Sequence, residues 1–501
     1  MSKSAVFLPD IRTKGNEIQM KLWSYKREPR EGRQPAERRA AAPKAGAVDF
    51  RALAKEWWFI ALMVVYALIS ILFLSRCSFA PDPSASDSPS AFQRSAAVPE
   101  AETETEPAFT QATLAYAGDL VCHDGLVDEA RTGDEYDFLP MLEGCVPYVQ
   151  DADLAFVTME TTFRDGTDYT GYPMFRSPKS LATALKDAGF DFINTASNHS
   201  MDSLKDGISS TLDVLDENGL DHIGTYRSQE EWDANHGVVV KDINGISIAF
   251  LSYTYGTNCI PVTGFEYAVN ICFKDYLDTY ADEITEFDYD RVDADLEYAR
   301  GLNTDLICVF MHWGLEYHTD PVDYQREVAD HLFEQGVDLI CGGHPHVPEP
   351  MEVRHVKDFE GNERTGYLCY CMGNFISTMN DHYTNLTGVT TIELEKNEST
   401  GETYLKNVSY APLIMVDTAD YGITGTDWRY KLVDLHKAID SYDSGDDLGF
   451  INETLYNALL TALDDVHDIF GVQFDRFDPG YTANTSGEMP VPPPAESDES
   501  A

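Results

Sequence analysis

Apolar positions between residues 111 and 413 follow two patterns that alternate along the chain. Short runs of aliphatic, β-branched and aromatic residues are typical of buried strands. Longer stretches with apolar residues three and four positions apart, each closed by a glycine, predict helices within 178–190, 203–220 and 323–337. Strands that alternate with helices are typical of a layered α/β domain, which is the fold class we expect.

The pattern changes on both sides of this region. Beyond about residue 412 the alternation weakens, and we interpret 414–478 as a C-terminal extension that packs on the main domain. Residues 76–110 and 479–501 are rich in Pro, Ser, Ala and Glu with few large apolar side chains, so both are predicted to be disordered, the first as a linker and the second as a tail.

The longest apolar run, WWFIALMVVYALISILFLS at 57–75, contains no charged residue over 19 positions. At about 1.5 Å per helical residue it is long enough to cross a hydrocarbon core of about 30 Å, so it predicts one transmembrane helix. A cleaved signal peptide is the alternative, but the basic segment 1–56 is too long to precede one. The positive-inside rule then predicts a cytoplasmic tail over 1–56 and an extracellular location for everything after residue 75.

Charge narrows the possible partners. The chain has 36 basic and 85 acidic residues, a formal net charge of −49, and the excess of acid lies after the apolar run. Such a chain is repelled by nucleic acid and by anionic membrane surfaces, so we expect neither as a partner. The nine cysteines show no spacing that indicates a disulfide framework.

Polar residues follow six of the predicted strands at the point where each apolar run stops. In α/β sheets ligands bind at the carboxyl ends of the strands, so these side chains are expected to converge on one cleft. Several of them stand beside a glycine, as in the stretch GGHPHV at 342–347. The candidate metal ligands are Asp119, Glu160, Asn198, His199, His312, His344 and His346.

The types of these residues indicate which ions they suit. Imidazole, carboxylate and amide oxygen together bind divalent ions such as Mn, Fe or Zn, and seven candidates exceed the needs of one tetrahedral site. They suit two metals about 3.5–4 Å apart. Other interpretations stay open for single residues: His312 as a packing residue, Asp119 as a turn or helix-capping residue, and 197–199 as the start of a helix.

Six sequence elements resemble one known family. They are AGDLV, VTMETTF, FRSPKSLATALKDAGFDFINTASNHSMD, MHWGLEYH, GVDLICGGHPHV and MGNFIS, between about residues 113 and 377. The chain is identified from them as a member of the capsule synthesis protein CapA family, also called the poly-γ-glutamate biosynthesis family, of the calcineurin-like metallophosphoesterase superfamily. The resemblance implies a four-layer α/β/β/α sandwich with a dinuclear metal centre at the strand ends.

The resemblance also implies roles for single residues. Asp119 matches the first acidic ligand and Glu160 the bridging carboxylate. Asn198 with His199 matches the Asn-His pair, His312 the isolated histidine, and His344 with His346 the Gly-His-x-His pair, of which one binds metal and the other contacts substrate. The superfamily begins with Asp-x-His, whereas Val121 stands at that position here and the nearest histidine is His123.

Four residues are candidates for catalysis. His199 or His346 would protonate the leaving group. Glu316, four residues after His312, would orient an imidazole, or else is a solvated loop carboxylate. Arg176 would grip an anionic substrate, with a surface ion pair as the equal alternative.

Two functions follow from the resemblance. The first is an extracellular, membrane-anchored hydrolase, in which a metal-activated hydroxide attacks a phosphoester or an amide of an anionic capsule or envelope polymer. The second is a subunit without catalysis that holds the polymer or other synthase and export subunits. Because the region after residue 76 carries 22 basic and 78 acidic residues, it should repel a polyanion, and a less charged envelope substrate is a further alternative.

Overall fold

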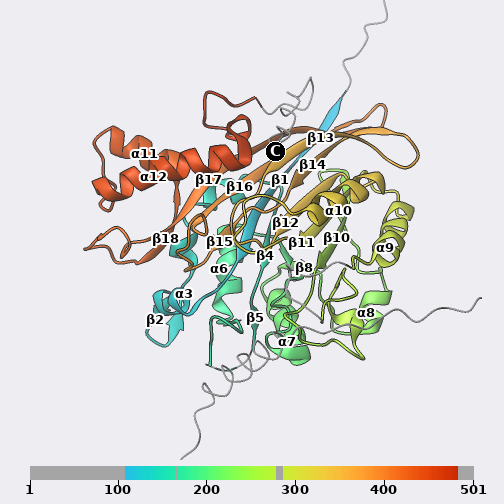
Figure 1. Cartoon of the computed structure of the whole chain (residues 1–501), viewed down its shortest axis with the longest axis horizontal. Helices are drawn as coiled ribbons and strands as arrows, with labels where there is room; N and C mark the ends of the chain where they lie inside the picture. The colour runs from blue at the N-terminus through green and yellow to red at the C-terminus, as the bar shows by residue number, and fades with distance from the viewer. Residues whose placement is uncertain (1–107, 165, 167, 278–285, 483–501) are drawn as a thin grey trace, which may run out of the picture. The chain divides into compact units, whose positions relative to one another are not determined.

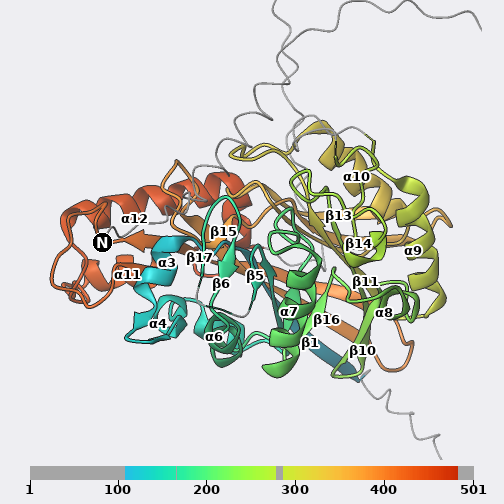
Figure 2. The ribbon, with the colours of Figure 1, turned by 90° about the horizontal axis from the view of Figure 1, so that it is seen from below.

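The computed structural model describes residues 108–164, 166, 168–277 and 286–482, which contain two β-sheets stacked face to face with helices on both outer sides (Figures 1 and 2). Within the described residues no helix is both long and apolar enough to span a lipid bilayer. The predicted cytoplasmic tail and transmembrane helix, and nearly all of the predicted linker and tail, lie outside the described residues.

The first sheet is mixed, with parallel strands beside a long antiparallel part. Its order is β18 (Tyr430–Asp434), β17 (Thr403–Asp417), β16 (Leu386–Asn397), β1 (Phe109–Leu120), β4 (Leu154–Met159), β7 (Phe192–Asn194) and β8 (Asp221–Ile223), with β15 (Asn374–Ile376) also beside β1. The second sheet has the order β13 (Met351–Lys357), β14 (Glu363–Cys369), β12 (Leu339–Gly343), β11 (Leu306–His312), β10 (Ile246–Thr254) and β9 (Val239–Ile243). Short pairs are formed by β2 (Arg131–Thr132) with β3 (Glu135–Tyr136) and by β5 (Thr162–Phe163) with β6 (Arg176–Ser177).

Alternation along the strands produces the layers. In β1, Leu114 and Tyr116 face the second sheet, whereas Ala115 and Ala117 face the helices outside the first sheet. Those helices are α3 (Asp124–Glu129), α4 (Leu139–Leu142), α5 (Val146–Gln150), α6 (Ser180–Ala188) and α7 (Leu204–Glu217). The outer side of the second sheet is covered by α9 (Tyr289–Gly301) and α10 (Asp323–Glu334), and α8 (Gln229–Asp233) precedes β9. The layers are therefore helix, sheet, sheet, helix, and the helices predicted within 178–190, 203–220 and 323–337 are confirmed.

The segment after β17 completes the core. The helices α11 (Leu435–Asp443) and α12 (Glu453–Val466) pack against the same inner face of the first sheet as the second sheet does. Figures 1 and 2 show them at the opposite end of the sheets from α9 and α10. The predicted boundary at residue 413 falls inside β17, so the first part of 414–478 is a continuation of the main sheet rather than a separate unit.

The end of β1 departs from a regular strand. Asp119 was expected just after the strand, but β1 continues to Leu120 with a register shift between Ala117 and Asp119. A side chain at Gly118 would lie 2.0 Å from the carbonyl oxygen of Gly373, so only glycine allows this approach of β15. Bulges of this kind re-aim a side chain, and this one turns Asp119 toward the second sheet.

Candidate metal centre

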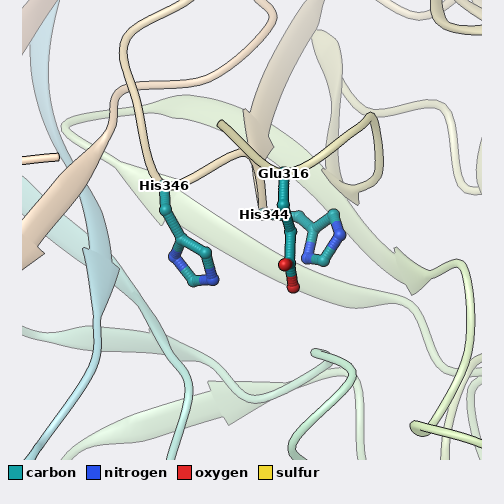
Figure 3. A group of neighbouring side chains, drawn as sticks. All are labelled: Glu316, His344 and His346. Atoms are coloured by element: carbon teal, nitrogen blue, oxygen red, sulfur yellow. The ribbon is translucent and has the colours of Figure 1, made fainter. Parts of the chain in front are cut away.

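Two groups of side chains converge at the carboxyl ends of the central strands. Asp119, Glu160 and His312 form the first group, and Glu316, His344 and His346 form the second. Within each group, one ligand atom of every residue lies within 4.8 Å of the others. Figure 3 shows the three side chains of the second group, which project from two loops toward a common space.

Glu160 connects the two groups. It directly follows β4, and its backbone N–H donates to the carbonyl oxygen of Leu120 at 2.9 Å, which fixes its place beside β1. Its Oε2 lies 3.7 Å from His312 Nε2 and its Oε1 lies 4.0 Å from His346 Nδ1. One carboxylate oxygen therefore lies toward a histidine of each group.

Buried polar atoms without partners identify what these groups suit. Among the described residues, six such atoms gather here: Asp119 Oδ1, Glu160 Oε1 and Oε2, His312 Nδ1, and His344 Nδ1 and Nε2. A buried polar atom without a hydrogen bond costs about 1–3 kcal/mol, and native proteins have few. Carboxylate oxygens and imidazole nitrogens are ligands of divalent cations, so the residues present fit metal ions.

Burial changes the ionisation of these groups in a consistent way. It raises the pKa of Asp119 to about 7, an effect that the His344 N–H opposes, and it raises the pKa of Glu160 well above its usual range. Burial also lowers the pKa of His312 and His344 well below normal, and that of His346 to about 3. The imidazoles are therefore neutral, as metal ligands must be, whereas the carboxyl groups need a nearby cation to ionise readily.

The GGHPHV stretch is a strained loop that supports the second group. A side chain at Gly343 would lie 2.3 Å from Asp119 Oδ1, so glycine lets the Asp119 carboxylate reach the His344 N–H, which donates to Oδ2 at 2.7 Å. His344 and His346 have φ values of 101° and 62°, which cost of order 1–3 kcal/mol each for residues with a side chain. This turn thus holds its two imidazoles against a backbone cost, as functional sites do.

Glu316 reaches the second group because two loops are joined. The N–H of Tyr317 donates to the carbonyl oxygen of Pro345 at 2.8 Å, which brings the loop after β11 beside GGHPHV. Glu316, four residues after His312, was expected to orient an imidazole, and the structure places its carboxylate with two of them, His344 and His346. It is thus positioned as a potential ligand.

Asn198 and His199 lie beside the first group. Asn198 Oδ1 is 2.9 Å from His312 Nε2, and its side-chain N–H donates to Asn258 Oδ1 at 3.2 Å. His199 belongs to neither group of ligand atoms. Its Nδ1–H donates to Asp202 Oδ2 at 2.7 Å, and its Nε2 lies 3.5 Å from the Asn258 amide nitrogen.

Arg176 and His123 are held by other contacts. Arg176 forms an ion pair with Asp168, the alternative stated for it, so a substrate role for Arg176 stays a prediction. His123 accepts the backbone N–H of Thr378 at 3.3 Å through Nδ1 and belongs to neither ligand group. The Phe175 ring packs edge-on against two imidazoles, with ring centroids 5.2 Å apart for His123 and 4.7 Å apart for His199.

Asn374 and Asp202 are two functional candidates that residue patterns did not assign. The Nδ1–H of His346 donates to Asn374 Oδ1 at 2.9 Å, which leaves Nε2 available to the second group. Asn374 in turn donates to the carbonyl oxygen of Thr384 at 3.0 Å, and Asp202 accepts from His199 and from the N–H of Phe175. Both lie within quoted motifs, MGNFIS and SNHSMD, but only three-dimensional contacts show which imidazole each one orients.

Replacing Asn374 with alanine is expected to weaken metal binding roughly 10–100-fold, the usual cost of losing a residue that orients a histidine ligand. The reason is that His346 would lose the acceptor that fixes its ring and tautomer. Titration of the apoprotein with Mn²⁺, followed by calorimetry, measures the affinity. Asn407→Ala, a change of the same residue type in β17, is the control and should leave the affinity unchanged; equal affinities for the parent and Asn374→Ala would exclude the orienting role.

Comparison with known proteins gives a consistent result. Residues 113–379 match the family described as bacterial capsule synthesis protein PGA_cap. The PGA biosynthesis protein CapA of Bacillus subtilis is 31% identical over 219 residues, which cover 44% of this chain and 51% of that protein. The capsule biosynthesis protein CapA of Bacillus anthracis is 27% identical over 193 residues, 38% of this chain and 41% of that protein. The chain thus spans about half the length of these relatives.

Two solved structures that match the chain are distant likenesses. A phosphatase from Mycoplasma pneumoniae has a TM-score of 0.35 and 15% identity, with 61% of this chain and 95% of that chain covered. The calcineurin-like phosphoesterase YfkN from Bacillus subtilis has a TM-score of 0.32 and 10% identity, with 72% and 99% covered. Because both scores are below 0.5, the architecture is defined by the strand order of this chain itself.

Proposed function

Because the chain belongs to the bacterial capsule synthesis protein PGA_cap family, we propose that it is a metal-dependent hydrolase that acts on a polymer of the capsule or cell envelope. The observation that carries this proposal is the set of six buried, unpartnered ligand atoms around Glu160. A scaffold protein would not need to bury such atoms without partners, because their cost is balanced only when cations bind.

We also propose where the protein acts. The uncharged run 57–75 and the basic residues before it support a single membrane anchor with the metal centre on the outer side. This location would bring the centre to a polymer as it leaves the cell, beside subunits that synthesise or export it. Protease protection of the C-terminal region in intact cells would contradict this orientation.

The chain's own residues supply binding and proton transfer in this mechanism. Asp119, Glu160 and His312 would hold one divalent ion and Glu316, His344 and His346 a second, with Mn, Fe or Zn as candidates. When bound, two such ions lower the pKa of a water molecule and stabilise negative charge on the reacting group. His199 is the candidate to protonate the leaving group, because Asp202 accepts its Nδ1–H and so holds the ring, and Nε2, 3.5 Å from the Asn258 amide nitrogen, would be the atom that donates.

The hydrolase proposal is tested by assaying the full-length chain, loaded with Mn²⁺, against phosphodiesters and against γ-glutamyl amides of increasing length. Cleavage of one class by the parent, lost in Asp119→Asn, would support the proposal and name the bond. A protein that binds two equivalents of metal and cleaves neither class would contradict it and favour a role in holding the polymer.

The role of His199 has a separate test. In Asp202→Asn, cleavage of a substrate with a poor leaving group is expected to fall on the order of 10²-fold, because the imidazole loses the acceptor that orients it. A nitrophenyl leaving group needs no proton, so its release should change little. Rates for the two substrates are compared at equal metal occupancy; an equal loss for both would show that Asp202 acts on metal binding or folding instead.

A further inference from the structure

A separate cluster of side chains that could bind a metal ion lies beside α11 and α12, outside the residues that match the family. It consists of His436 in the first turn of α11, His467 directly after α12, and Asp475 after the 3₁₀ turn Val472–Phe474. The Nε2 atoms of His436 and His467 lie 2.7 and 2.8 Å from the same oxygen, Asp475 Oδ2. Two imidazoles thus face one carboxylate oxygen from separate segments.

The burial of these groups distinguishes the cluster from an exposed ion pair. The Asp475 side chain is 0% exposed, while those of His436 and His467 are 18% and 16% exposed. The carboxylate is therefore at the base of the cluster, and solvent reaches its outer edge. The other oxygen, Oδ1, accepts the N–H of Phe477 at 2.9 Å, which fixes the carboxylate in place as an outer hydrogen bond does for a metal ligand.

The local backbone is also unusual. His467 begins a π-helical turn, His467–Gly471, at the end of α12. Such turns are rare and occur frequently at functional sites. The turn ends at Gly471, with φ of 96°, and the chain then reverses so that Asp475 returns to the histidines only eight residues after His467.

We propose that His436, His467 and Asp475 bind one borderline divalent cation, with Zn²⁺ as the best match, at a site separate from the metal centre around Glu160. Two imidazoles and one carboxylate are a common ligand set for such ions, and the exposed side of the cluster leaves room for water as a further ligand. The site does not depend on the proposed hydrolase activity.

The position of the site indicates what the ion does. The backbone of Asp475 forms a parallel β-bridge with Tyr410 of β17. The rings of Tyr410 and Phe470 pack against each other with their centroids 5.2 Å apart. An ion at this site would join α11, the end of α12 and the segment beside β17. It therefore acts as a structural clamp that fixes the helical pair to the main sheet.

A matched variant separates a metal site from a hydrogen-bonded cluster. His467→Gln keeps an N–H donor for Asp475 but removes the imidazole, so a cluster that only needs hydrogen bonds would survive it. The test is made in full-length chain that also carries Glu160→Ala and His344→Ala, so that the main centre does not contribute. Zn²⁺ content is measured by elemental analysis after dialysis, and thermal unfolding is recorded with and without Zn²⁺.

The background variant is expected to hold about one equivalent of Zn²⁺ and to unfold at a higher temperature when Zn²⁺ is present. Addition of His467→Gln should remove that equivalent, weaken binding roughly 100-fold, and abolish the thermal shift. The control is His331→Gln, which changes a histidine of α10 that pairs with Asp293 of α9. It should leave the Zn²⁺ content and the thermal shift unchanged. Equal Zn²⁺ content and equal thermal shifts with and without His467→Gln would overturn the proposal.

Discussion

Replacing Glu160 with glutamine is expected to remove most of the metal from the centre without destabilising the apoprotein. Glu160 faces both ligand groups and is fully buried, so the loss of its charge should weaken the binding of both ions at once. Activity on the cleaved substrate should fall on the order of 10³-fold, since the metals contribute several kcal/mol of charge stabilisation and about 1.4 kcal/mol corresponds to tenfold. Elemental analysis and rate measurements at fixed Mn²⁺ test both parts.

The apoprotein part of this prediction follows from the pKa of Glu160. Burial, together with the nearby Asp119 and Glu316 carboxyls, raises that pKa well above normal, so the apoprotein already keeps the group uncharged at a cost. Glutamine imposes no such cost. Chemical denaturation in EDTA should therefore give Glu160→Gln a free energy of unfolding at least equal to that of the parent.

Glu349 provides the matched control. It is also 0% exposed, its Oε2 accepts from Gln325 at 2.9 Å, and burial raises its pKa to about 8, yet it belongs to neither ligand group. Glu349→Gln should keep full metal content. If both variants lost metal equally, the effect of Glu160→Gln would come from a buried charge in general, and the bridging role would be wrong.

Residue patterns predicted the parts of this protein that depend on local sequence. The α/β class and the three helices were predictable because apolar spacing reflects which face of each element is buried. The convergence of Glu160, His312 and His344 was predictable because each stands where an apolar run stops, and strand ends of one sheet edge meet in space.

Contacts between distant segments were not predictable in this way. The carboxylate of Glu316 joins His344 only because Tyr317 bonds to Pro345 across two loops, a contact that no spacing in the sequence encodes. The cluster of His436, His467 and Asp475 was missed for the same reason. His467 and Asp475 follow no strand, and a π-helical turn brings them together.

Asp119→Asn is expected to change stability in opposite directions with and without metal. In EDTA the folded apoprotein holds Asp119 with a pKa of about 7, whereas an unfolded aspartate has a pKa of about 3.9. Below about pH 4 both states are protonated and folding carries no cost. As the pH rises toward 7 the unfolded state releases the proton first, so the parent loses stability, on the order of 4 kcal/mol in total.

The neighbouring imidazoles give the stability the opposite dependence on pH. The variant and the parent must therefore be compared at each pH. His346 has a pKa of about 3 in the folded state, so the unfolded state gains a proton below about pH 6.5 and stability falls as the pH falls. This effect is common to the parent and to Asp119→Asn. The difference between them therefore reports the Asp119 carboxyl together with its effect on the pKa of Glu160, and in EDTA it should favour the variant increasingly from about pH 4 to pH 7.

Saturating metal should reverse the order, because a cation beside Asp119 stabilises the charged carboxylate. At a free concentration about 1,000 times the Kd, the parent gains about 4 kcal/mol from binding, and the variant, which binds more weakly, gains less. Urea denaturation at pH 5, 6, 7 and 8, with EDTA and with Mn²⁺, measures these differences. The difference in stability between the parent and Asp187→Asn, a change at an exposed position of α6, should not vary with pH or metal. A difference between Asp119→Asn and the parent that stays constant with pH in EDTA would mean that Asp119 titrates normally, and the buried ligand set would then be wrong.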